Sequence, residues 1–536
     1  MTGPLVAVCY KNVGVGLTSE SELSSDEELR AIQEAALARA EARRKLGTSS
    51  RREYDAAASD RRDPKESAAR ASANARSAWK RMWVTEQAPT EAFSIVDRLV
   101  GSPYANPRVR TVPQDILAVN TIEFVLDLGE QMFRYGAGAL EVETSMIAVM
   151  ASFGLRNVDV DITYQSIHVN YAPPNAASLS LLRVVRSWTN NYAGLALVHQ
   201  LVTDIVQDGV SQAEAVERLR DITRRPKQFP KWIVSAAGAI FAGLFVLYIG
   251  GSPTGSLVAF VSSIIVMEIG KLGAKWRIPE FFATAASAFA ATAIAMVLWA
   301  LDVLISPAIV VAGGIMLLLP SARIVSSVQD AINGFPVTAA GRAFSAMITY
   351  AAIVAGIVAA LVLGSLAGVP SLDVAQVSSI SYPWWAMLLT VGMATAAITA
   401  VEQSAIRLLL PTAGIAMLGF LAYSGSQWIG AGERLTPAVA AVVIGFAARL
   451  FAMRSSAPQL VIAVPAIVFL LPGLMIFRSM YVIAMNTSEL VTGLAGMFNA
   501  MMIIMAVAAG VVLGDTLARP FTRGWSRNER RRIRRR

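Results

Sequence analysis

The chain has 536 residues, of which 54% are hydrophobic and only 16% are charged, and its mean hydropathy is +0.51. Soluble globular proteins carry about 25% charged residues, so this composition excludes an ordinary soluble enzyme of this length. The formal net charge is +9, while one cysteine (Cys9) and two histidines exclude an internal disulfide and a cysteine-rich metal site. We therefore expect no metal and no other cofactor.

Residues 1–95 predict a disordered, charged N-terminal tail. They are rich in alanine, arginine, glutamate and serine and poor in large apolar residues, so they cannot bury enough surface to offset the entropy of folding. No secretory signal peptide precedes them, which favours a cytoplasmic location. Acidic residues are interleaved with the arginines, so we expect a solvated tail, with anionic lipid as the alternative partner and no nucleic acid.

Residues 96–230 predict a cytoplasmic α+β domain. Apolar residues recur with a helical period in two segments, then alternate with polar residues as in half-buried strands. A capping box, Ser211 to Glu214, begins the last helix. The predicted elements are helices at 116–135 and 142–153, strands around 158–162, 167–171 and 182–185, and helices at 192–207 and 211–224.

Four acidic residues and a histidine occur within 28 positions of this domain's sequence: Glu141, Glu143, Asp159, Asp161 and His168. Such a set could indicate a hydrolase, but no nucleophile and base lie at a suitable spacing. We expect surface or structural roles for these side chains. A membrane-anchored enzyme or sensor acting through this domain is the alternative to a transport function.

From Trp232 to Leu517 the chain is a series of long apolar runs. A helix needs about 20 apolar residues to cross a bilayer core about 30 Å thick. Ten runs in one chain argue against the buried core of a soluble protein. We predict ten spans at about 232–250, 256–270, 281–301, 303–319, 341–364, 384–401, 407–424, 436–453, 459–477 and 491–517.

The basic residues predict the orientation of these spans. With the N-terminus inside, the inner loops contain Lys271, Arg323, Arg407 and Arg454, whereas the outer loops carry few charges. A basic tail, residues 520–536, also falls inside. An even number of spans places both termini on the cytoplasmic side, in agreement with the charge bias. We therefore predict a multi-pass protein of the bacterial plasma membrane.

Two segments five spans apart are alike. Residues 317–323 read LLLPSAR, and residues 470–478 read LLPGLMIFR. We expect a polar connection after each and then a helix rich in small residues, in which Gly356 and Gly510 allow close packing. An odd offset places the two repeats, residues 231–365 and 366–519, in opposite orientations, as in many secondary transporters. The fold class is therefore a polytopic α-helical membrane protein with two inverted five-helix repeats.

Residues 134–156, RYGAGALEVETSMIAVMASFGLR, followed by two alternating strands, resemble the start of the threonine/serine exporter (ThrE) family. The family's Leu-Pro-Gly motif is similar to Leu319-Pro320, with Ser321 in place of glycine, and to Leu471-Pro472-Gly473. Asp330 and the pair Gly341-Arg342 also match its pattern. The resemblance covers about residues 110–517. It implies a cytoplasmic N-terminal domain, ten spans, and export of threonine and serine driven by the proton motive force. Related two-chain proteins are associated with dicarboxylate export.

No G-x-x-x-x-G-K-[ST] motif occurs, which disfavours an ATP-driven pump. A carrier for a zwitterion needs donors for the carboxylate, an acceptor for the ammonium and a titratable group for coupling. Pro320 and Pro472 each remove a helical hydrogen bond, so the broken helix could hold a carboxylate; a plain kink is the alternative. The candidate substrate and coupling residues are Pro320, Ser321, Asp330, Arg342, Glu402, Pro472, Gly473 and Asn499.

Each of these residues also has a structural interpretation. Asn499 could form an interhelical hydrogen bond instead of a site contact. Glu402, like Glu268, Asp302 and Asp515, lies near a span end, where a solvated or salt-bridged role is the alternative to proton coupling. Arg342 could pair with Asp330 or act as a positive-inside anchor.

The sequence therefore predicts a secondary active exporter of threonine and serine, with protons as the coupling ion and the lipid bilayer as its environment. Export of a dicarboxylate or another small metabolite is the alternative within transport. A homo-oligomer is compatible with the sequence, which does not define the oligomeric state.

Overall fold

The computed structural model describes residues 116–173, 177–303, 305–369, 380–455, 457–485 and 487–522. The predicted disordered tail, residues 1–95, lies outside these residues, and so does the basic tail from residue 523 onward. The described part is mainly helical and contains one small sheet.

The predicted α+β region contains four helices and three strands within the described residues. All the helices and strands expected from the sequence are present, with ends that differ by a few residues. In chain order they are α3 (Ile116–Arg134), α4 (Ala139–Ser152), β1 (Val158–Thr163), β2 (Ser166–Tyr171), β3 (Leu179–Val184), α5 (Tyr192–Asp208) and α6 (Gln212–Arg224).

Side-chain caps explain where two of these helices begin. The Ser211 hydroxyl accepts a hydrogen bond from the Glu214 amide at 3.3 Å, which confirms the predicted start of α6. Asn191 Oδ1 accepts from the Gly194 amide at 3.0 Å and begins α5 in the same way. Gly209 ends α5 in the left-handed conformation, with a φ of 71°.

The three strands form an antiparallel sheet in the order β1-β2-β3. In β1, Val158 and Ile162 are buried while the aspartates between them are exposed, as the alternation predicts. β3 is present, but its apolar residues face both ways. Leu181 packs toward the core, whereas Leu182 and Val184, the residues that indicated this strand, are exposed.

Eight helices of the described residues are long and apolar enough to cross a membrane. They coincide with eight of the ten runs predicted from the sequence. They are α7 (Lys231–Tyr248), α8 (Pro253–Lys275), α9 (Glu280–Ala300), α12 (Pro336–Leu366), α13 (Trp384–Val401), α14 (Ile406–Trp428), α15 (Gly432–Ser455) and α18 (Leu490–Thr522).

The other two runs belong to bent helix pairs, and the count reaches ten if each pair is one span. The first pair is α10 (Pro307–Ile315) with the 3-10 turn η2 (Met316–Leu318), followed by α11 (Ser321–Ile332). The second is α16 (Leu460–Ile467) with η3 (Val468–Leu470), followed by α17 (Gly473–Met485). The segments expected as polar connections after each Leu-Pro step are helical, and the first, α11, is polar whereas the second, α17, is mostly apolar.

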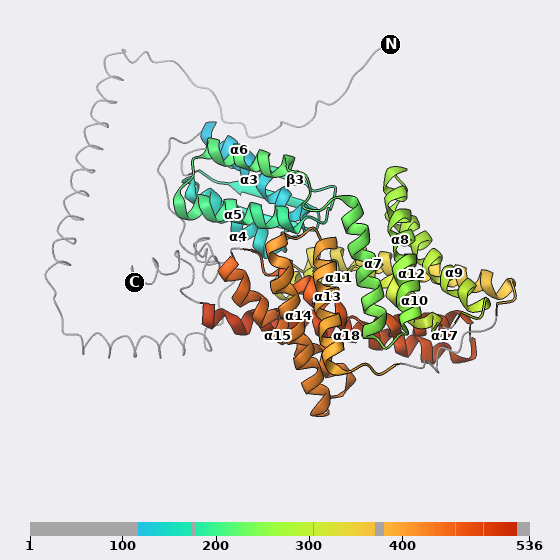
Figure 1. The fold of residues 1–536 in the computed structure, drawn as a ribbon. Coiled ribbons are helices and arrows are strands. Elements are labelled where there is room, and N and C mark those ends of the chain that lie inside the picture. The colour runs from blue at the N-terminus through green and yellow to red at the C-terminus, as the bar shows by residue number, and fades with distance from the viewer. Residues whose placement is uncertain are drawn as a thin grey trace, which may run out of the picture. The chain divides into compact units, whose positions relative to one another are not determined.

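The two halves of the membrane region pack their helices in the same way. The contacts of α7 with α8, α8 with α9, and α9 with α12 recur as α13 with α14, α14 with α15, and α15 with α18. Helices α7 and α13, the first of each half, also contact one another. Figure 1 shows the chain order of these helices in colour. The repeat in the sequence is therefore accompanied by a repeat in helix contacts.

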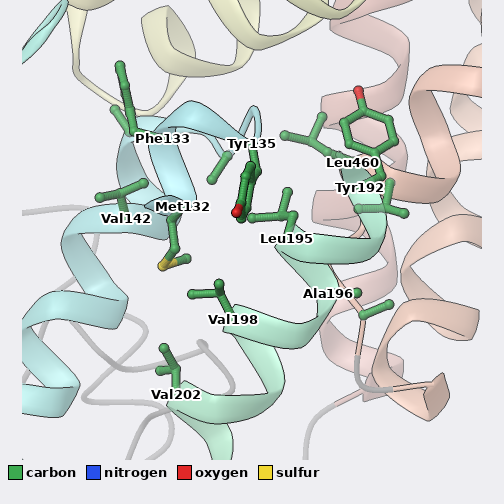
Figure 2. Packing of buried hydrophobic residues seen from close by; sticks show 14 of the residues in the cluster. Met132, Phe133, Tyr135, Val142, Tyr192, Leu195, Ala196, Val198, Val202 and Leu460 are labelled. Atoms are coloured by element: carbon green, nitrogen blue, oxygen red, sulfur yellow. The ribbon is translucent and has the colours of Figure 1, made fainter. Parts of the chain in front are cut away.

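The α+β region shares its hydrophobic core with the membrane helices. Figure 2 shows Met132 of α3 and Val198 of α5 directed toward one another between the two helices. Leu460 of α16 lies near Tyr192 in the same cluster of buried residues. Apolar burial of this kind is the main favourable term in domain packing, so the two regions form one continuous packed unit.

Candidate functional site

Each bent pair breaks at its Leu-Pro step. The angle between the two parts is 59° in the first pair and 52° in the second. The leucine before each proline is extended, with ψ of 129° at Leu319 and 135° at Leu471. Proline has no amide hydrogen, so the helical hydrogen-bond ladder stops here and a new helix begins.

Three backbone hydrogen bonds shape each break, and they join the same relative positions. In the first break they are Leu319 N to Met316 O, Ser321 N to Leu319 O and Ile324 N to Pro320 O. In the second they are Leu471 N to Val468 O, Gly473 N to Leu471 O and Ile476 N to Pro472 O. The two breaks therefore have the same backbone hydrogen-bond pattern. Ser321 in the first break is equivalent to Gly473 in the second.

The helix after the first break carries a buried ion pair. Asp330 Oδ2 of α11 lies 2.9 Å from Arg342 Nη1 of α12, and both side chains are almost fully buried. The other carboxylate oxygen, Oδ1, accepts a hydrogen bond from the Ala139 amide at 2.8 Å. Ala139 is the first residue of α4, so Asp330 places a negative charge at the positive end of that helix.

Arg342 is held by the α+β region on its other side. Its Nη2 donates to the Ala137 carbonyl at 2.9 Å. The guanidinium lies 4.6 Å from the ring centre of Phe133 and 5.2 Å from that of Trp188, within the range of cation–π attraction. The Asp330–Arg342 pair therefore joins α11 and α12 to α3 and α4.

The β1–β2 hairpin contacts the start of α12. The Thr338 hydroxyl donates to the Ile162 carbonyl at 2.7 Å and accepts from the Tyr164 amide at 3.0 Å. The Tyr164 ring lies against Gly341, and a side chain at position 341 would overlap it. The family-like pair Gly341-Arg342 is thus a docking surface for the α+β region.

The turn between α13 and α14 provides a second docking point. The Glu402 and Gln403 carbonyls accept from the Tyr192 and Ala193 amides, at 3.3 and 2.8 Å. These amides belong to the first turn of α5, and the first amides of a helix have no hydrogen-bond acceptors within the helix itself. The Gln403 side-chain amide also exchanges two hydrogen bonds with the backbone of Phe229, at 2.8 and 3.0 Å. Both halves of the membrane region are therefore tied to the α+β region.

A cleft opens between these docking points. Its lining includes Arg134, Trp188, Ser326, Arg342 and Glu402, together with the first turn of α11. Burial raises the pKa of the Glu402 carboxyl to about 7, although the charge of Lys227 acts in the opposite direction. Glu402 is therefore protonated more readily than an exposed glutamate.

The other three acids near span ends have ordinary surroundings. Glu268 pairs with Lys271 at 2.6 Å, and Asp515 lies between Arg449 and Arg519 at 2.8 and 3.0 Å. Asp302 is exposed in the turn after α9. Salt-bridged or solvated roles therefore describe these three residues, whereas Glu402 differs from them.

Comparison with known proteins identifies the family. The family model ThrE, described as "Putative threonine/serine exporter", matches residues 123–364 and 370–518, which is most of the chain. The chain belongs to the threonine/serine exporter family. Its resemblance in residues 134–156 and at the Leu-Pro steps is therefore part of a match that spans both regions.

Individual relatives support the same assignment. A "Probable threonine/serine exporter" of Mycobacterium tuberculosis is 31% identical over 435 residues, covering 79% of this chain and 82% of the relative. A "Threonine/serine exporter" of Corynebacterium glutamicum is 28% identical over 449 residues, covering 80% and 89%. The "Probable succinate transporter subunit YjjP" of Escherichia coli is 29% identical over 146 residues, covering 27% and 57%. No solved structure matches the chain.

Membership in this family, together with the apolar helices, makes this a multi-pass membrane protein of a transporter class. Family members are transporters rather than enzymes. Within the described residues, no three histidine, cysteine or acidic side chains lie together in a way that could bind a metal.

The predicted site residues do not all lie in one place. Arg342 and Glu402 line the cleft, and Asp330 is paired with Arg342 without being part of the lining. Ser321 begins the helix whose first turn lines the cleft. Pro472 and Gly473 lie at the second break, where Gly473 packs against Met316 of the first. Asn499 is half-buried on α18.

Sequence reasoning missed the residues that the α+β region contributes to the cleft. Arg134 and Trp188 line it, and Ala139 binds the Asp330 carboxylate. Arg134 is about 190 residues from Arg323 and Ser326, the α11 residues that line the same cleft. The one available signal was the glycine-rich loop before α4, whose amide-bearing helix start is a common anion site.

Proposed function

We propose that this protein is a secondary active exporter of threonine and serine, driven by the proton motive force, in a bacterial plasma membrane. The observation that carries the proposal is the pair of matched helix breaks in a chain of the exporter family. Broken helices with free amides at their starts are a common way for carriers to hold small anionic groups within the membrane. The two relatives named as threonine/serine exporters support the substrate class.

In this proposal the two halves are inverted repeats, and each bent pair crosses the membrane once. The recurring helix contacts and the identical hydrogen bonds at the breaks support it. Five crossings per half give opposite orientations, whereas four would give the same orientation. The α+β region and both termini then lie in the cytoplasm, in agreement with the basic inner loops.

Cysteine labelling tests this orientation. In a Cys9→Ser background, Ala274→Cys lies in the last turn of α8 and Ala331→Cys lies at the end of α11, and both positions are exposed. If the first bent pair crosses the membrane, both cysteines react with a membrane-impermeant reagent only from the cytoplasmic side. Thr254→Cys should react only from outside. Labelling of positions 274 and 331 from opposite sides would show that the pair re-enters instead of crossing.

Efflux from loaded proteoliposomes tests the activity. We expect threonine and serine to leave faster than from protein-free vesicles, and an inward proton gradient to accelerate their release. Succinate is the competitor that tests the alternative of dicarboxylate export, which the similarity to the succinate transporter subunit supports. Threonine release at the rate of empty vesicles would refute the proposal. Strong inhibition of threonine release by succinate would favour the alternative of dicarboxylate export.

A further inference from the structure

The cleft between the α+β region and the membrane helices has a distinctive charge balance. Two of its arginines are already neutralised. Arg342 is paired with Asp330, and Arg323 Nη2 lies 2.7 Å from Glu280 Oε1 and its Nη1 donates to Thr349. These two side chains therefore have no free charge to offer a ligand.

Two other charged groups in the lining have no such partner. Within the residues that the structure describes, Arg134 forms no ion pair, and its Nε is buried without a hydrogen-bond acceptor. The Glu402 side chain likewise has no ion pair or hydrogen bond among these residues. Its nearest basic neighbour, Lys227, is instead held by the Thr189 hydroxyl at 2.7 Å and the Asn190 carbonyl at 3.1 Å. Leaving charges unpaired in a partly buried site is costly, so a ligand would stabilise both.

The rest of the lining is mixed in a way that suits a small hydroxylated molecule. Ser326 and Ser345 line the cleft, and in the described structure neither hydroxyl forms a hydrogen bond. Trp188 and Tyr164 also line the cleft and add aromatic surface to it. Sites for small polar ligands combine apolar walls with a few well-placed polar groups in this way.

We propose that this cleft is the cytoplasmic loading site for a small hydroxylated α-amino acid, with Arg134 binding the carboxylate and Glu402 the ammonium. A guanidinium matches a carboxylate through two parallel hydrogen bonds, and a carboxylate is the natural acceptor for an ammonium. Ser326 and Ser345 then bind the side-chain hydroxyl. The inference rests on the proposed export function and gives the α+β region a direct part in substrate binding.

The position of the cleft fits a loading site. Ala322 and Arg323, in the first turn of α11, line it, and they follow directly after the Leu319-Pro320 break. The first amides of a helix lack internal acceptors and form its positive end. A carboxylate bound in the cleft would therefore lie close to the positive start of α11.

Binding of tritiated L-threonine to the full-length protein in lipid nanodiscs tests the proposal. We expect Arg134→Gln and Glu402→Gln each to weaken binding by about tenfold or more, the usual effect of losing a charge-assisted hydrogen bond. Arg134→Lys should recover part of the affinity because it keeps the charge. Arg156→Gln and Glu217→Gln are matched controls, since both side chains are exposed on the α+β region away from the cleft.

Analogues assign each charge to its partner. 1-Amino-2-propanol lacks the carboxylate of threonine, so its competition should be unchanged by Arg134→Gln and weakened by Glu402→Gln. 3-Hydroxybutyrate lacks the ammonium, so the opposite pattern is expected. A general loss of structure would weaken both analogues in both variants, which separates misfolding from loss of a specific contact.

The outcomes also separate this inference from the proposed function. If the wild-type protein exports threonine and both glutamine variants bind it like the controls, the cleft is not the loading site and the export function stands. If the wild-type protein neither binds nor exports threonine or serine, the export function fails, and the loading site fails with it.

Discussion

The two helix breaks share a Leu-Pro step and a backbone geometry, but the helices that follow them differ in sequence and in contacts. Both bend by more than 50° after a 3-10 turn and use the same three hydrogen bonds. The helix after the first break, α11, carries Arg323 and Asp330 and joins the α+β region. The helix after the second, α17, has the apolar sequence GLMIFRSMYVIAM, with Arg478 as its one charged residue.

This difference shows that the two halves share the helix break but not the ion pair that follows it. The break depends on local backbone chemistry, a proline after an extended leucine, so it survives wherever the Leu-Pro step does. The ion pair depends on a partner outside the repeat, the start of α4, and is found in one half alone among the described residues. Five predictions test this comparison.

Removing the buried charge in the first half should have the largest effect. Asp330→Ala leaves the Arg342 guanidinium buried without a counter-charge, and we expect a loss of about 3–5 kcal/mol in the free energy of unfolding. Unfolding by sodium dodecyl sulfate in mixed micelles measures this loss. Asp330→Leu combined with Arg342→Met removes both charges and should recover most of it.

The matching experiment in the second half is Asp515→Ala. Asp515 has two partners, Arg519, which is 44% exposed, and Arg449, which is 15% exposed, so water solvates only part of the freed charge and we expect about 2 kcal/mol. Equal losses for Asp330→Ala and Asp515→Ala would contradict the view that the first half carries the special ion pair.

Helix packing should respond equally in both halves. A Cβ atom at Gly356 would overlap the Ala285 carbonyl of α9, and one at Gly510 would lie 2.8 Å from the Ala438 carbonyl of α15. We expect Gly356→Ala and Gly510→Ala each to cost about 1–3 kcal/mol, since backbone cannot move aside cheaply. Gly270→Ala and Gly425→Ala are controls with open space around them. A large cost in one half alone would argue against matched packing.

The turn between α13 and α14 should give a smaller, pH-dependent effect. The pKa of Glu402 is raised from 4.5 to about 7, so the folded protein favours the protonated form. Its stabilising contribution is complete below pH 4.5 and is lost as the pH rises to about 7. Glu402→Gln should therefore gain thermal stability over the wild type as the pH rises through this window. A difference in Tm that does not vary with pH would exclude Glu402 as the titrating group.

The residue that differs between the two breaks should matter least. Ser321→Gly changes one first-turn residue of α11, and we expect about 0.5 kcal/mol. The reverse change, Gly473→Ser, pushes against the flexible end of Met316 and should cost about 1 kcal/mol. Threonine efflux measured on both variants shows whether the glycine itself has a role. A loss of efflux for Ser321→Gly would mean that the serine contacts the substrate.

Much of the fold was predictable because its signals are local. The capping box at Ser211, the alternation in β1 and the long apolar runs each depend on neighbouring residues. The helices α11 and α17 were missed because each is only 12 or 13 residues long and follows a proline, so neither forms a run of spanning length.

The candidate site was predictable only in part. A pairing of Asp330 with Arg342 was one of two expectations, since the residues lie 12 positions apart across a short connection. That the same carboxylate binds the start of α4 requires a contact between residues 191 positions apart. No pattern within either segment carries that information.

A multi-pass helical protein with two Leu-Pro breaks could be predicted from the amino-acid sequence, because hydropathy and proline act on the nearest turns of the chain. That Arg134 and Glu402 line one cleft beside the first break is known only from the three-dimensional fold. Burial and electrostatic pairing depend on distance in space, and residues of α3, α12 and the α13–α14 turn line the same cleft although they are far apart in the chain.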